Sequence, residues 1–297
     1  MCGIVGLHLR DPELYPQLGR LLETMLGQVV ERGPDSAGVA VYGDRRRCPE
    51  GYAAVSVLAP AHTDFGVLGV SDLLVTGAGD TTVLAAPIAP DALVAAVRTA
   101  LPTATVVGSG TDLTVYKGTG SPRTLAATYD LANAQGWQGL AHTRMATESA
   151  VTPEGCHPFS VGPDQCLVHN GSFANHATIR RELQAAGHVF DSENDSEVGA
   201  RFVADRLAAG EDLDKALRLL CERFDGFYTL LVTSADGFAV VRDAIACKPA
   251  IIAETDRWVA MASEFRALAD LPGIADARLY EPEPERVYAW TREGVIA

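Results

Sequence analysis

The chain is 297 residues long, and its 47% hydrophobic and 21% charged residues match folded globular proteins rather than disordered or fibrous ones. Lys and Arg number 24 against 38 Asp and Glu, and this net charge of −14, spread along the chain, argues against nucleic-acid partners because phosphates would be repelled. No apolar run approaches the roughly 18 residues of a membrane span and the N-terminus lacks the cationic start of a secretory signal, so we expect a cytoplasmic protein without a membrane partner.

The first 42 residues read as strand, helix and strand. The apolar, glycine-bounded run Gly3–Leu7 predicts a buried strand. Leucines and other apolar residues at helical spacing predict an amphipathic helix over 15–30. The segment RGPD at 32–35 breaks that helix, and the apolar run 37–42 predicts a second strand.

The middle of the chain, from 43 to about 134, is less regular. Segments 67–75 and 81–88 alternate as strands do, and 91–100 has helical spacing. Gly108-Ser109-Gly110 lacks both the lysine of a phosphate loop and the full glycine spacing of a dinucleotide site, so we expect a turn there.

The second half alternates less than a doubly wound protein would. Strands and helices are predicted in runs: strands ending at 142–144 and at 166–169, helices at 174–186 and 196–208, and strands at 227–232, 249–253 and 286–290. Runs of each type without regular alternation favour an α+β layered fold.

The six cysteines are scattered without a C-x-x-C pair, which favours reduced thiols over a disulfide framework. One cluster, Cys156-His157 with Cys166 and His169, could be a metal site, but its spacing matches none of the usual zinc patterns. We therefore expect two buried cysteines and two hydrogen-bonded histidines, with no metal and no cofactor in this chain.

Cys2 follows Met1 directly, and a small second residue permits removal of the initiator methionine. The thiol would then stand beside a free α-amine, and both groups can exchange a proton near neutral pH. Together they form a nucleophile and its base within one residue. The alternative is that Cys2 is simply a small buried hydrophobic residue.

Five blocks occur in the order MCGIVG, RGPDSAGVAVYG, AHTRMATES, VHNG and ENDSE. Together they resemble the class II glutamine amidotransferase family, over residues 1–42 and about 106–268. The resemblance implies an α+β fold, the four-layer αββα sandwich of N-terminal-nucleophile hydrolases, as one domain over 1–297. The stretch between the second and third blocks is longer than the family leads us to expect, which predicts an insertion at about 46–105.

The resemblance also implies which residue carries out each step of glutamine hydrolysis. Cys2 would attack the side-chain amide of L-glutamine and form a thioester. The side-chain amide of Asn170 and the backbone N–H of Gly171 would stabilise the oxyanion, as two donors aimed at that point can. For Asn170-Gly171 the alternative is a plain tight turn, which this dipeptide often makes.

The amino-acid end of glutamine needs a cation and an anion. By resemblance, Arg144 binds the carboxylate, with a hydroxyl contact from Thr147, and Asp195 receives the ammonium. The alternatives are a surface ion pair for Arg144 and a helix N-cap for Asp195. Arg32, in RGPD, is expected to shape the loop beside the nucleophile. Met145 stands where several family branches carry tryptophan.

The acceptor of the ammonia has no recognisable motif in this chain. We find no adenylation loop, no phosphoribosyl-pyrophosphate motif and no sugar-phosphate isomerase domain. The chain therefore resembles stand-alone glutaminase subunits that serve a separate synthase subunit, such as glutamate-synthase-like partners or the N-methylglutamate synthase assembly. The alternatives are a catalytically weak regulatory or scaffold subunit, and an amidase for another γ-glutamyl amide.

Overall fold

The computed structural model describes residues 2–145 and 151–295 and contains three antiparallel sheets. The largest has seven strands in the order β14-β12-β13-β1-β8-β2-β7. Their bounds are β1 Gly3–Leu9, β2 Ser36–Tyr42, β7 Leu113–Thr119, β8 Gln138–Arg144, β12 Ile251–Glu254, β13 Trp258–Ala262 and β14 Arg278–Tyr280. The predicted first two strands are therefore confirmed, and β8 lies between them.

The second sheet has five strands in the order β16-β15-β11-β10-β9. Their bounds are β9 Cys166–Phe173, β10 Gly226–Thr233, β11 Gly237–Arg242, β15 Tyr288–Thr291 and β16 Gly294–Val295. The two large sheets face each other across a buried apolar core in which Ile4 and Met261 of one sheet join Leu231, Phe238 and Trp290 of the other. Because side chains alternate along a strand, every second residue of β1 points into this core.

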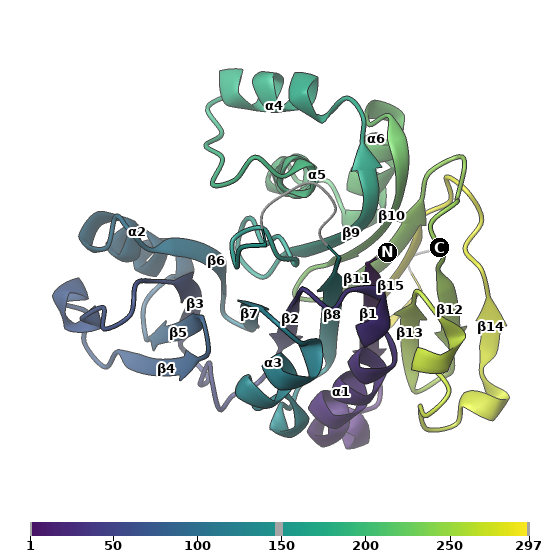
Figure 1. Ribbon diagram of the computed structural model, residues 1–297, viewed down its shortest axis with the longest axis horizontal. Coiled ribbons are helices and arrows are strands. Elements are labelled where there is room, and N and C mark those ends of the chain that lie inside the picture. Colours follow the sequence, from purple (N-terminus) through teal and green to yellow (C-terminus); the bar gives the residue numbers. More distant parts are fainter. Residues whose placement is uncertain (1, 146–150, 296–297) are drawn as a thin grey trace.

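Helices cover the two outer faces, as Figure 1 shows. Helices α1 (Leu18–Gln28) and α3 (Pro122–Thr128) pack on the seven-stranded sheet. Helices α5 (Asp195–Ala208) and α6 (Leu213–Arg223) pack on the five-stranded sheet, and α4 (His176–Ala185) packs against α5. Short 3-10 helices occupy Pro12–Gln17, Val30–Arg32, Phe65–Leu68, Leu131–Asn133, Phe265–Ala267 and Ile274–Asp276. The predicted αββα layering is confirmed. Within the described part of the chain, no helix has both the length and the apolarity to cross a membrane.

The third sheet forms a smaller unit to one side of the sandwich, at the left of Figure 1. Its strands, in the order β4-β5-β3-β6, are β3 Ala53–Leu58, β4 Leu74–Ala78, β5 Thr81–Ala86 and β6 Thr105–Gly110. Helix α2 (Pro90–Ala100) packs on it through Leu93 and Val97, so the unit has a core of its own. This unit lies beside β7. It contains most of residues 46–105, the range predicted to be an insertion, and that interpretation remains a prediction.

Two predictions for the middle of the chain were wrong. Gly108 and Gly110 lie in strand β6, not in a turn, and pair with β3. Their glycine character reflects close packing, because a Cβ at Gly110 would lie 1.9 Å from the carboxylate of Asp164. Segment 67–75 begins in a 3-10 helix, and only its last two residues belong to a strand.

Candidate active site

Cys2 is held by its main chain at the end of the seven-stranded sheet. Its carbonyl oxygen accepts hydrogen bonds from Arg32 Nε at 3.0 Å and from Asn170 Nδ2 at 3.1 Å. The next residue, Gly3, donates its N–H to Thr143 Oγ1 at 3.1 Å. Arg32 in turn pairs with Glu264 at 2.9 Å, so this arginine shapes the surroundings of Cys2 as expected. These contacts fix the backbone while the thiol itself stays partly exposed.

The thiol of Cys2 lies in an environment that favours its ionised form. Burial raises the pKa of Cys2, but a hydrogen bond and charge from His142, the N–H of Met145 and the amino-terminal charge together lower it to about 7. Met145 donates its N–H to Sγ at 3.5 Å. A large fraction of Cys2 is therefore thiolate, the nucleophilic form, at neutral pH.

Alkylation of Cys2 is expected to follow this pKa. The rate of reaction with iodoacetamide should rise with pH through an inflection near 7, since the thiolate is present above the pKa and is lost below it. In His142→Leu the inflection should move upward, past the ordinary thiol value of about 8.5, because burial is then less opposed. Site-resolved mass spectrometry over pH 5 to 10 would check this, with Cys247, an exposed thiol, as the internal reference. An unchanged profile in the variant would contradict the assignment.

His142 determines which way the amide of Asn170 faces. His142 Nε2 lies 3.1 Å from Asn170 Oδ1, and the amide nitrogen of Asn170 contacts the Cys2 carbonyl at 3.1 Å and Ser263 Oγ at 3.4 Å. An asparagine oxygen only accepts and its nitrogen only donates, so this network assigns Nε2–H to His142. The NH₂ group of Asn170 is thereby directed to the side where Cys2 lies.

Gly171 presents its N–H off the edge of the five-stranded sheet. Ala174 donates its N–H to the main-chain carbonyl of Asp225, just before β10, at 2.8 Å. Phe173 donates its N–H to the carboxylate of Asp195 at 2.9 Å, on the side away from β10. Since N–H directions alternate along a strand, that of Gly171 points the same way as that of Phe173. Asn170 and Gly171 both lie within β9, so the tight-turn alternative is wrong.

Gly171 also has a backbone conformation that other residues rarely adopt. Its φ is +134°, and an added Cβ would lie 1.9 Å from the carbonyl oxygen of Phe227. Gly171→Ala should therefore lower the free energy of unfolding by about 2 kcal/mol or more in excess of the loss from backbone strain, because the added carbon also clashes with Phe227. The matched control is Gly120→Ala, at φ +112° with nothing within 4 Å of the added carbon. Urea denaturation of both variants would measure the difference, and equal losses would refute it.

Asp195 is the first residue of α5, beside the strand end that carries Gly171. The N-cap of this helix is Asn194, whose side chain accepts the N–H of Ser196 at 2.9 Å, so the N-cap interpretation of Asp195 is wrong. One carboxylate oxygen of Asp195 accepts the N–H of Phe173, and the side chain is 22% exposed. Asp195 is thus anchored but still accessible to a cationic group.

Arg144 ends strand β8 and is only 8% exposed, so it is not a surface ion-pairing residue. Its guanidinium lies near Gly155, where an added Cβ would be 3.5 Å from Nη1. By strand register and alternation it shares a face with His142, whose ring contacts Asn170. Thr147 lies outside the described residues.

A bridge of buried histidines, which sequence reasoning did not assign to the site, runs behind these residues. His157 Nε2 and His169 Nδ1 both lie 2.9 Å from Ser196 Oγ, and the rings of His142 and His157 are 4.1 Å apart. Burial holds the pKa values of His157 and His169 below the usual range, with the charge of Asp195 opposing the shift at His169. The expected hydrogen-bonded histidines are confirmed, as are the buried thiols of the same cluster.

Comparison with known proteins identifies the family. A glutamine amidotransferase domain matches residues 142–270. The glutamine amidotransferase-like protein GlxB of Rhizobium meliloti (strain 1021) is 46% identical over 304 residues, which cover 99% of both chains. The chain belongs to the class II glutamine amidotransferase family. Family membership implies glutamine as the substrate and an acceptor for its ammonia.

Other class II glutamine amidotransferases match only in part. Glutamine–fructose-6-phosphate aminotransferase of Streptomyces coelicolor is 36% identical over 159 residues, 53% of this chain and 25% of that enzyme. The solved structure of glutamine phosphoribosylpyrophosphate amidotransferase from B. subtilis has a TM-score of 0.64 at 18% identity. It covers 99% of this chain and 48% of that one, so this chain spans about half of that enzyme, and the likeness shows the fold alone.

Proposed function

We propose that this class II glutamine amidotransferase hydrolyses L-glutamine to glutamate and ammonia with Cys2 as the nucleophile. The observation that carries the proposal is the contact between Asn170 Nδ2 and the Cys2 carbonyl at 3.1 Å. In support, the amide NH₂ of Asn170 is oriented toward the main chain of the residue whose thiol pKa is lowered to about 7. Removal of Met1 would add a free α-amine to the same residue.

The reaction would proceed through a thioester. Sγ of Cys2 attacks the side-chain amide carbon of glutamine, and the carbonyl oxygen becomes an oxyanion that Asn170 Nδ2–H and Gly171 N–H stabilise. The α-amine of Cys2 carries the thiol proton to the amide nitrogen, and ammonia leaves as the C–N bond breaks. Water then attacks the thioester carbon, its proton returns to sulfur, and glutamate is released.

The substrate's amino-acid end would be held by two oppositely charged side chains. Arg144 supplies a guanidinium fork that suits a carboxylate, and Asp195 supplies a carboxylate for the ammonium. Both lie at the same end of the sandwich as Cys2, because Arg144 ends β8 next to Met145, whose N–H contacts Cys2, and Asp195 binds the strand that carries Gly171. The hydroxyl contact from Thr147 remains part of the proposal.

The ammonia would pass to a separate synthase subunit. What supports this is the match with GlxB over 99% of both chains, whereas this chain matches only 25% of the fructose-6-phosphate aminotransferase. A glutamate-synthase-like or N-methylglutamate synthase partner is the specific form of this proposal. The chain itself would need no cofactor for the hydrolysis.

Three measurements test this function directly. The intact mass of the purified chain should lack Met1, and retention of Met1 would refute the α-amine mechanism. Incubation with L-glutamine should yield equal amounts of glutamate and ammonia. Affinity purification from the native organism followed by mass spectrometry should recover a synthase subunit, and recovery of the chain alone would contradict the partner proposal.

A further inference from the structure

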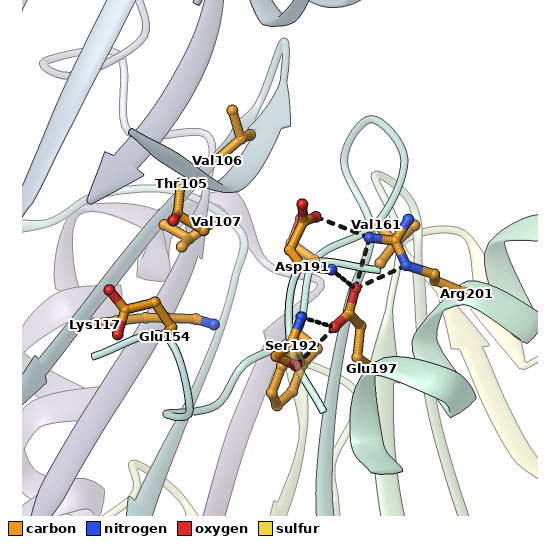
Figure 2. Close-up of a pocket in the computed structure, with 12 residues that line it drawn as sticks. Thr105, Val106, Val107, Lys117, Glu154, Val161, Asp191, Ser192, Glu197 and Arg201 are labelled. Carbon is orange, nitrogen blue, oxygen red and sulfur yellow. Dashed lines mark hydrogen bonds and ion pairs between the residues drawn. The ribbon is translucent and has the colours of Figure 1, made fainter. Parts of the chain in front are cut away.

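The first turn of helix α5 is tied to the loop that precedes it, as Figure 2 shows. Glu197 accepts hydrogen bonds from the N–H groups of Asp191 at 2.8 Å and Ser192 at 2.7 Å, both in that loop. Arg201, one turn further along the helix, donates from Nε to the same carboxylate at 2.8 Å. The backbone at the start of α5 is therefore anchored, and the direction of the Asp195 carboxylate depends on the contacts of that side chain.

Each oxygen of the Asp195 carboxylate has a donor beside it. Oδ2 accepts the main-chain N–H of Phe173 at 2.9 Å, and Oδ1 lies 3.4 Å from the hydroxyl of Ser196, the next residue. His169 Nδ1 is farther from Oδ1, at 4.0 Å. Ser196 is only 1% exposed, so its hydroxyl is shielded from solvent. The second contact of Asp195 is thus made by a buried side chain that a substitution can remove.

The hydroxyl of Ser196 has three polar neighbours and a single proton. His157 Nε2 and His169 Nδ1 each lie 2.9 Å from Ser196 Oγ, and Asp195 Oδ1 is the third neighbour. A hydroxyl donates once and accepts twice, so all three contacts are satisfied together only when two neighbours donate and one accepts. A carboxylate oxygen only accepts. Ser196 therefore donates to Asp195 if both imidazoles donate to Ser196.

The other nitrogens of the two histidines show that both imidazoles do donate. Burial lowers the pKa values of His157 and His169, so each ring is neutral at pH 7 and carries one N–H. His157 Nδ1 and His169 Nε2 are buried with no hydrogen-bond partner among the described residues. A buried N–H without an acceptor is rarer than a buried lone pair without a donor. The proton of each ring is therefore assigned to the nitrogen that faces Ser196.

We propose that Ser196 is a positioning residue whose hydroxyl directs the carboxylate of Asp195 toward the ammonium of glutamine, and so favours amides that carry an α-amino group. The inference rests on the proposed function, in which Asp195 receives that ammonium. Without the hydroxyl, the N–H groups of His157 and His169 lose their acceptor. The carboxylate of Asp195, 4.0 Å from His169 Nδ1, would then turn toward these donors and away from the substrate.

The test compares L-glutamine with glutaramate, which keeps the amide and the carboxylate but lacks the α-amino group. Dissociation constants of both ligands are measured by ligand-observed NMR titration in a Cys2→Ala background, so that no turnover intervenes. With Ser196 intact, L-glutamine should bind at least about tenfold more tightly than glutaramate, as expected for one charge-assisted contact. Adding Ser196→Ala should reduce this ratio about fivefold by weakening L-glutamine binding, with the glutaramate constant within about twofold of its original value.

Three further variants in the same background separate positioning from a general loss of packing. Asp195→Asn should remove most of the preference for L-glutamine. Ser56→Ala, at a serine of the small sheet that is also 1% exposed, should leave the preference unchanged. Ser196→Cys keeps the size of the side chain but replaces the hydroxyl with a weak donor, so it should resemble Ser196→Ala. It carries the test if thermal unfolding shows that the alanine variant does not fold.

An unchanged ratio in a folded Ser196 variant, or equal losses for both ligands, would overturn the inference. So would the absence of any preference for L-glutamine with Ser196 intact. In the protein that retains Cys2, Ser196→Ala should raise KM for L-glutamine about fivefold, with kcat within about twofold of the wild-type value. If that protein hydrolyses nothing while the binding ratios are as expected, the proposed function is wrong and the positioning role of Ser196 is supported.

Discussion

Replacing Cys2 with alanine is expected to reduce glutamine hydrolysis by at least about a thousandfold, because no other group in the site can form the thioester. The variant keeps the main-chain contacts of Cys2 with Arg32 and Asn170, which use the backbone carbonyl and not the side chain. Glutamate release from L-glutamine would be measured for both proteins at saturating substrate. The loss should therefore appear in kcat with an intact fold.

The matched control for Cys2→Ala is Cys247→Ala, since Cys247 is an exposed thiol outside the site. This control should retain the wild-type rate. Equal glutamate release by wild type and Cys2→Ala would instead favour the regulatory or scaffold alternative. Release of ammonia from a different γ-glutamyl amide, with glutamine inert, would point to the amidase alternative while keeping Cys2 as the nucleophile.

Asn170→Ala is expected to lower kcat by about a hundredfold to a thousandfold, the usual cost of one oxyanion donor. The amide of Asn170 is oriented by His142 at 3.1 Å, and its NH₂ group donates to the Cys2 carbonyl, so the proposed donor already faces the residue of the nucleophile. A donor that acts on the developing charge affects kcat more than KM. Steady-state kinetics with L-glutamine would separate the two parameters. Asn133→Ala, on the exposed side of the molecule, serves as the control.

The same substitution removes the contact of Asn170 with the Cys2 carbonyl, which could displace the nucleophile. The alkylation profile of Cys2 distinguishes these two effects. An inflection that stays near pH 7 in Asn170→Ala would show that the thiol keeps its environment and that the loss comes from the missing donor. A rise in KM with an unchanged kcat would contradict the oxyanion role.

The layered fold was predictable where local pattern and tertiary environment agree. The run at Gly3–Leu7, the helix that becomes α1 and the strand within 37–42 are each determined by apolar spacing that matches their burial. The small sheet was harder, because its edge strand β4 is largely exposed and its apolar residues do not follow a buried pattern. The predicted turn at Gly108-Ser109-Gly110 failed because those glycines serve packing against Val115 and Asp164, residues that only the fold brings near.

The residues of the candidate site also fall into two groups, those recognisable from sequence motifs and those whose roles depend on tertiary contacts. Cys2, Arg144, Asn170, Gly171 and Asp195 were recognisable because each stands in a short ordered motif. His142 stands in the same motif as Arg144, yet its effect on the pKa of Cys2 and on the amide of Asn170 depends on contacts between different strands. Ser196 was hidden for the same reason, since it acts by joining two histidines from separate segments.

By itself the sequence predicted an α+β layered fold from apolar periodicity. The order of its motifs gave the family resemblance, and that resemblance implied the αββα layering and the residues available for chemistry. Only the tertiary structure decided how those residues face one another. It directed the amide of Asn170 toward Cys2, moved the N-cap of α5 to Asn194 and buried Lys117 against the ring of Phe159. Orientation, burial and charge pairing arise between segments far apart in sequence, and local pattern contains no record of them.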